Sequence, residues 1–101
     1  MLACNLNAIS EAELSTYRSL CSRLQDAVTE RRELTDGYAF RLTEESVSLL
    51  DAARWVNLER LCCPFLTFRL EITGSERDYW LTLEGPLGAK AIVHEALGSR
   101  R

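Results

Sequence analysis

The chain has 101 residues, and its 12 basic and 15 acidic side chains give a net charge of −3. This balance argues against nucleic-acid binding, because no basic stripe is present to meet phosphates, and the basic pair Arg100-Arg101 is expected to be a solvated tail. No apolar run reaches the roughly 20 residues of a membrane span, and the first residues lack the pattern of a signal peptide. We therefore expect one domain over residues 1–101, with residues 1–9 as an N-terminal arm, in the cytoplasm, where thiols stay reduced.

The first third of the chain predicts a long helix. Ser10 and Glu13 fit a capping box. Apolar residues then recur at spacings of three and four, at Leu14, Tyr17, Cys21, Leu24 and Val28. This pattern predicts a helix over residues 11–32. Cys21 is expected to pack in its apolar stripe, because cysteine behaves as a small hydrophobic residue in cores.

A strand and a second helix are predicted next. Apolar side chains alternate with others over residues 38–42, which is typical of a strand. Thr43 can cap a helix predicted over residues 44–62, and the two glutamates that follow it suit the positive end of the helix dipole. This helix has apolar residues on more than one side, so we expect it to be buried on more than one side.

The last part of the chain predicts a hairpin and a final helix. Alternation is clearest over residues 66–72, and a turn then leads to a return strand at residues 79–84. Pro86 suits the first turn of the last helix and Gly98 its end. We expect an α/β (α+β) fold, ordered helix, strand, helix, strand, strand, helix, with a three-stranded sheet and helices packed mainly on one face. The long helix between the first two strands permits them to pair in parallel.

One segment, Glu-Arg-Leu-Cys-Cys-Pro-Phe starting at Glu59, asks for a chemical explanation. Glu59, Cys62 and Cys63 share one helix face, and Trp55, one turn earlier, can cover the same surface. Pro64 disfavours the helical conformation at Cys63, which is therefore expected to be the last helical residue or the first extended one. The negative end of the helix raises thiol pKa values and favours a bound cation. The pair therefore suits a soft-metal ligand set better than an activated nucleophile.

Three segments of the chain occur together: Ala3-Cys4, the stretch Asp-Gly-Tyr-Ala-Phe-Arg-Leu that begins at Asp36, and the segment that begins at Glu59. Together they resemble a family of small bacterial proteins of uncharacterised function, and the similarity spans nearly the whole chain. The positions that match the family pattern are Cys4, Glu59, Cys62 and Cys63. Cys21 is not among them, which favours a core role for that thiol. The resemblance implies no substrate.

Three interpretations of the cysteines stay open. In the first, Cys62, Cys63 and a returning Cys4 bind a soft metal or metalloid ion such as Zn(II), Cu(I) or Hg(II), with Glu59 as an additional oxygen ligand. The one histidine, His94, is expected on the outer face of the last helix. In the second, the thiols act in redox chemistry or sensing, where a Cys4–Cys63 disulfide is easier to form than a strained Cys62–Cys63 one. In the third, the chain is a non-catalytic interaction module with structural cysteines.

Enzymatic activity is not expected from the motifs, because the sequence has no Gly-rich phosphate loop and no Ser/His/Asp set. A three-stranded sheet leaves exposed edges. Trp80 projects opposite Leu81, toward a face where no helix layer is expected. We therefore expect a homodimer in which strand 79–84 or its Trp80 face meets its mate.

Overall fold

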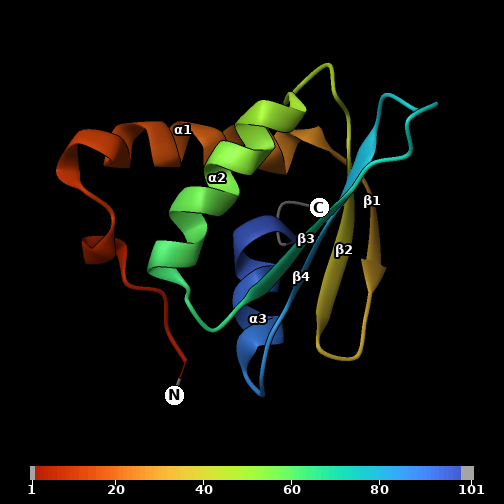
Figure 1. Ribbon diagram of the computed structural model, residues 1–101. Helices are drawn as coiled ribbons and strands as arrows, with labels where there is room; N and C mark the ends of the chain where they lie inside the picture. The colour runs from red at the N-terminus through yellow and green to blue at the C-terminus, as the bar shows by residue number, and fades with distance from the viewer. Residues whose placement is uncertain (1, 99–101) are drawn as a thin grey trace.

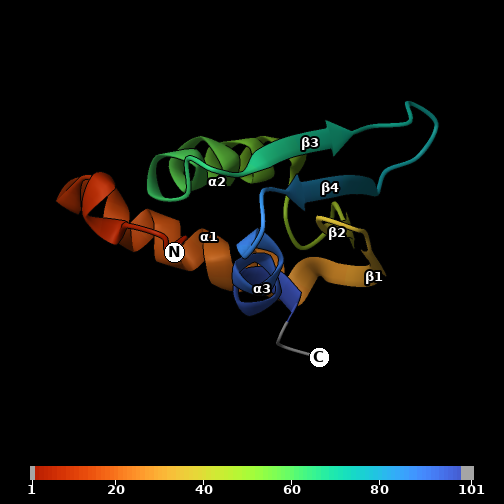
Figure 2. The ribbon, with the colours of Figure 1, turned by 90° about the horizontal axis from the view of Figure 1, so that it is seen from below.

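A four-stranded antiparallel sheet in the order β1-β2-β4-β3 is the frame of the computed structural model, which describes residues 2–98 (Figure 1). The helices lie together on one side of the sheet (Figure 2). The pair Arg100-Arg101 lies outside the described residues. In chain order the elements are η1 (Leu6–Ala8), α1 (Glu11–Ala27), β1 (Val28–Glu33), β2 (Gly37–Leu42), α2 (Leu49–Cys62), β3 (Thr67–Glu71), β4 (Tyr79–Glu84), α3 (Ala89–Val93) and the π-helical turn η2 (His94–Gly98). The fold is therefore α+β, as predicted, but the sheet has four strands rather than three.

The fourth strand comes from the segment predicted as the end of the first helix. α1 ends at Ala27, and β1 follows at once and pairs with β2 in an antiparallel hairpin. Only Val28 of β1 is buried, and the other five residues are exposed and mostly charged. The sequence thus carries no apolar alternation that would indicate a strand. Its position depends on the backbone ladder, which the Leu34 N–H extends by donating to the Gly37 carbonyl oxygen at 2.9 Å.

Two helices begin later than predicted. α2 starts at Leu49 because Ser48 is its N-cap and accepts a hydrogen bond from the Asp51 N–H at 3.1 Å. Thr43, the predicted cap, instead supplies a carbonyl oxygen to the turn before Val47. The last helix starts at Ala89, after the turn that contains Pro86. α1 does begin after Ser10, although the Ser10 hydroxyl donates to the Glu13 carboxylate and makes no side-chain cap to the backbone.

The predicted hairpin of β3 and β4 is confirmed, with Thr67 opposite Glu84 and Glu71 opposite Trp80. β4 also pairs with β2, so it lies inside the sheet. β2 and β3 therefore do not form the parallel pair that the helical connection permits. The free edges are β1 and β3, so an edge-to-edge dimer through strand 79–84, one of the two contacts predicted, is not possible in this sheet.

The core lies between the helices and one face of the sheet. Along β4, Tyr79, Leu81 and Leu83 are buried, while Trp80 and the other alternate residues are only partly so. α2 crosses this face and buries Trp55, Leu58, Glu59 and Cys62 among its residues. Glu59 is the one charged side chain that is buried within residues 2–98. None of the helices within residues 2–98 is both long and apolar enough to cross a membrane.

Candidate functional site

The carboxyl end of α2 places the two adjacent cysteines. Cys62 is the last helical residue and Cys63 is the C-cap, whose N–H donates to the Glu59 carbonyl oxygen at 2.7 Å. Cys63 has left the helical conformation, with φ −126° and ψ 69°, as the proline that follows it requires. The prediction that Cys63 is the last helical or first extended residue is confirmed.

The N-terminal arm returns to this helix end and brings Cys4 with it. The Asn5 N–H donates to the Cys62 carbonyl oxygen at 2.8 Å. Leu2, which precedes Cys4 in the sequence, packs against the core, and Ile9, which follows it, is buried. Cys4 and Cys63, whose Cα atoms are 4.8 Å apart, are joined by a disulfide bond. Three independent contacts thus hold the arm in place besides the disulfide.

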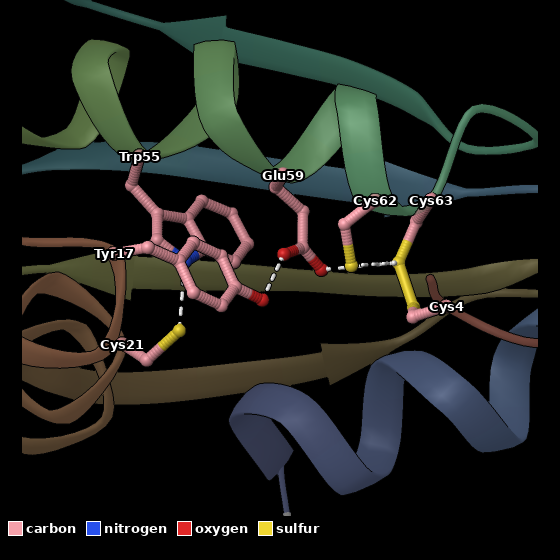
Figure 3. The surroundings of a disulfide bond; sticks show 7 residues. All are labelled: Cys4, Tyr17, Cys21, Trp55, Glu59, Cys62 and Cys63. Atoms are coloured by element: carbon pink, nitrogen blue, oxygen red, sulfur yellow. Dashed lines mark hydrogen bonds between the residues drawn. A yellow bond between two sulfur atoms is a disulfide. The ribbon is translucent and has the colours of Figure 1, made fainter. Parts of the chain in front are cut away.

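Three sulfur atoms gather at this point (Figure 3). The Sγ atoms of Cys4, Cys62 and Cys63 all lie within 4.8 Å of one another. The Cys62 and Cys63 Sγ atoms are 3.5 Å apart, and Cys62 is a free thiol. Cys62 is 1% exposed and Cys63 0%, whereas Cys4 lies at the surface. The cluster is therefore open on the side of the arm and buried on the side of the helix.

Glu59 faces the cluster from one turn earlier in α2. Its Oε2 atom is 3.4 Å from the Cys63 Sγ, and its Oε1 accepts a hydrogen bond of 2.5 Å from the Tyr17 hydroxyl of α1. Cys63 can donate to Glu59 only after reduction, because a disulfide sulfur carries no hydrogen. Burial raises the pKa of Glu59, and the bond from Tyr17 offsets only part of that effect. The carboxyl group is thus held in place against the sulfur atoms by a residue of the neighbouring helix.

The free thiol of the cluster, on Cys62, is not activated. Burial, and then the nearby Glu59 carboxyl, raise the pKa of Cys62. The helix end contributes negative partial charge. Among the described residues, Cys62 and Glu59 form hydrogen bonds with Tyr17, Cys63 and the Asn5 backbone, none of which is a cation. The site therefore lacks the positive surroundings of a low-pKa nucleophile.

Trp55, expected from the sequence to cover the surface of Glu59 and the two cysteines, points toward Cys21 in the structure (Figure 3). Its indole N–H donates to the Cys21 Sγ at 3.2 Å, and its ring meets Phe68 edge-on at a centroid distance of 6.3 Å. Figure 3 shows Tyr17 between the Trp55–Cys21 pair and Glu59. Between α1 and α2 the structure thus has two separate polar pairs, Trp55 with Cys21 and Tyr17 with Glu59, and the second pair lies nearer the cluster.

Sequence reasoning missed Tyr17 as a site residue. It was assigned only to the apolar stripe of the first helix. A signal was available, because a buried tyrosine needs a hydrogen-bond partner and Glu59 needs a donor. His94, expected on the outer face of the last helix, is exposed and packs against the Tyr38 ring at a centroid distance of 5.8 Å.

Comparisons of the chain with protein-family models, with curated proteins and with solved structures find no match. Any functional conclusion has to come from the geometry of the cysteine cluster.

Proposed function

We propose that the reduced protein binds a soft metal or metalloid ion through Cys4, Cys62 and Cys63. The observation that carries this proposal is the gathering of three sulfur atoms within 4.8 Å of one another, although Cys4 and Cys63 are 59 residues apart in the sequence. With metal–sulfur bonds of about 2.3 Å, two sulfurs on one tetrahedral or trigonal ion lie roughly 3.5–4 Å apart. The Cys62 and Cys63 sulfurs, at 3.5 Å, already have such a separation. Glu59 is the additional oxygen ligand for an ion that needs one.

The disulfide closes this site, and its reduction opens it. Reduction supplies two of the three ligands, since a metal binds the thiolate and not the disulfide. Cys4 stays near Cys63 after reduction because the Asn5 hydrogen bond and the packing of Leu2 and Ile9 do not depend on the disulfide. In the cytoplasm, the compartment we propose for this chain and for the bacterial family it resembles, reducing conditions would favour the open form.

The test uses protein reduced under nitrogen and freed of reductant. Titration with Zn(II) or Hg(II) is expected to show one ion per chain, with thiolate absorbance in the near ultraviolet. Cys62→Ser and Cys63→Ser should lose most of this binding. Cys21→Ser is the matched control and should keep it, because that sulfur belongs to the Trp55 contact. Equal binding by the wild type and a Cys62→Ser/Cys63→Ser double variant would contradict the proposal.

Thiol redox sensing is the second candidate, and the Cys4–Cys63 disulfide favours it. The chain would then report oxidation by tying its N-terminal arm to α2. Differential alkylation in glutathione buffers of graded potential is the measurement. A reversible Cys4–Cys63 transition within the range of the buffers supports sensing, whereas a bond that never forms or never opens there contradicts it.

We also propose that the helix-free face of the sheet is a homodimer contact centred on Trp80. This side chain alternates with buried residues of β4 and so lies on the face opposite the helices. The Arg32 guanidinium lies 4.3 Å from its ring centroid, so the second protomer would contact a cation–aromatic pair. Light scattering at micromolar concentration should show a dimer that Trp80→Glu splits. A monomeric wild type would contradict this proposal.

A further inference from the structure

We propose that the ligand of this site is a trivalent metalloid that arrives as a neutral hydroxide, of which arsenous acid is the simplest example. This inference rests on the metal-binding function proposed above and names the class of its ligand. It is carried by the number of ligands that the fold brings together and by the charge that the site can hold.

The ligand count is three. Within residues 2–98, the potential metal ligands that gather are the sulfurs of Cys4, Cys62 and Cys63. The fourth sulfur, on Cys21, accepts the Trp55 indole N–H, and His94 packs on the Tyr38 ring. Structural zinc sites take four protein ligands, so a zinc ion held in that way would also need the Glu59 carboxylate, whose Oε2 lies 3.4 Å from the Cys63 Sγ. A trivalent metalloid needs only three sulfurs, because its lone pair occupies the remaining side.

The charge count also favours a trivalent centre. Three thiolates around a divalent ion carry a net charge of −1, whereas three thiolates around a trivalent centre are neutral. Two of the three sulfurs come from residues that are at most 1% exposed, and Glu59, the neighbouring acid, is 2% exposed. An unpaired negative charge is costly in such surroundings, and the helix end adds to that cost. A neutral complex avoids it and leaves Glu59 bonded to Tyr17.

The binding step balances without an oxidant or a base. One arsenous acid and three cysteine thiols give one tris-thiolate complex and three water molecules. Three As–O and three S–H bonds break, and three As–S and three O–H bonds form. The arsenic stays trivalent, and each thiol proton leaves on a hydroxide of the ligand. A divalent aqua ion brings no hydroxide that can take up those protons, so it has to release them to solvent.

The reach of the arm decides whether the third sulfur takes part. Adjacent thiols alone can hold an arsenical that has two exchangeable positions, such as phenylarsine oxide, whose third bond is to carbon. Arsenite engages all three cysteines only if Cys4 stays beside the helix end after reduction. The Asn5 N–H bond to the Cys62 carbonyl oxygen, at 2.8 Å, provides that placement. Cys4→Ser therefore separates a three-sulfur site from a simple adjacent dithiol.

The experiment titrates protein that is reduced and kept under nitrogen, with no added thiol. Sodium arsenite, Zn(II) and phenylarsine oxide are the probes, and calorimetry in two buffers of different ionisation enthalpy counts the protons released. We expect one arsenite per chain, bound more tightly than Zn(II) and with no net proton release. Cys4→Ser should lower the affinity for arsenite by more than about 100-fold. That is the upper limit of the loss in metal affinity when only an outer-sphere partner of a ligand is removed. Cys4→Ser should leave the affinity for phenylarsine oxide unchanged. Cys21→Ser should change neither the affinities for the three probes nor the number of protons released.

The outcomes separate this inference from the proposed function. If Zn(II) binds at the cluster and arsenite binds more weakly, the metal site stands and the metalloid assignment is overturned. If Cys4→Ser binds arsenite as tightly as the wild type, the three-sulfur assignment is overturned. If neither Zn(II) nor arsenite binds the reduced protein, both the function and the inference fail.

Discussion

The two ends of the α1–α2 interface use cysteine in different ways. At one end, Cys21 sits alone against Trp55, whose indole N–H it accepts at 3.2 Å. At the other end, Cys62 and Cys63 meet a third sulfur that the N-terminal arm brings from the far end of the sequence. Tyr17 of α1 and Glu59 of α2 lie between the two ends and are joined by a hydrogen bond (Figure 3). The comparison teaches that a lone, half-buried thiol packs against its neighbour, whereas a group of sulfurs forms only where a distant part of the chain adds a third cysteine.

The Trp55 end should dominate stability. Trp55 is fully buried against α1 and the sheet, so Trp55→Ala leaves a cavity and should cost about 3–5 kcal/mol in the free energy of unfolding. Denaturant unfolding of the reduced protein measures this cost. The variant that still folds should bind one soft ion per chain, because Trp55 does not touch the cluster. A decrease of less than about 1 kcal/mol in the free energy of unfolding would show that Trp55 is not tightly packed between α1 and the sheet.

Reduction of the disulfide should have the next largest effect on stability. The bond closes a sequence separation of 59 residues, and the chain-entropy model assigns about 4 kcal/mol to such a loop. Unfolding of the wild type with and without reductant measures the difference. Cys4→Ser is the control, and reductant should not change its unfolding. If reduction leaves the wild type equally stable, the disulfide does not constrain the unfolded chain.

Glu59 should make stability depend on pH. Burial raises the pKa of Glu59 in the folded protein above its value of about 4.3 in the unfolded chain, so the folded state binds more protons. The contribution of Glu59 is fully present below about pH 4.3 and falls as pH rises through the folded pKa. Glu59→Gln keeps an acceptor for Tyr17 and should abolish this fall. The measurement is the difference in unfolding free energy between the two proteins from pH 4 to pH 8.

An opposite trend, with the wild type gaining stability over Glu59→Gln as pH rises, would contradict a pKa of Glu59 that is raised by burial. It would indicate instead that a charge partner stabilises the carboxylate. Both proteins have to be compared in the same redox state, since reduction gives Cys63 a hydrogen that it can donate to Glu59 at 3.4 Å.

The smallest effect is expected at Cys21. Cys21→Ala removes the sulfur that accepts from the Trp55 indole, and one unsatisfied donor costs about 1–3 kcal/mol when buried. Cys21 is only partly buried, so water can replace part of this bond and the loss should lie near the lower limit. Thermal unfolding measures it. A loss as large as that of Trp55→Ala would mean that Cys21 carries more than a packing contact.

The predictions from the sequence were correct where an element leaves a local pattern, such as apolar alternation in a strand or a proline at the end of a helix. Alternation located the β3–β4 hairpin, and Pro64 located the end of α2. β1 was missed because its exposed, mostly charged residues contribute no apolar face and only the backbone ladder defines it. The start of α2 was misplaced because both Thr43 and Ser48 are good caps, and only the tertiary structure selects Ser48.

For the candidate site, helical spacing was enough to place Glu59, Cys62 and Cys63 together. The return of Cys4 depends on how the arm packs, through Asn5 and two apolar anchors, and no periodicity encodes such a path. Tyr17 was assigned to the core because its position in an apolar stripe does not reveal that its hydroxyl reaches a neighbouring helix.

The most direct test of the central claim is to count the sulfur neighbours of an ion bound to the reduced protein. X-ray absorption spectroscopy of the protein with one equivalent of arsenite or Zn(II) gives that number. Three sulfur atoms at about 2.3 Å are expected for the wild type and for Cys21→Ser, and two for Cys4→Ser. A first shell of nitrogen and oxygen, or a wild-type spectrum with no sulfur shell, would contradict the account.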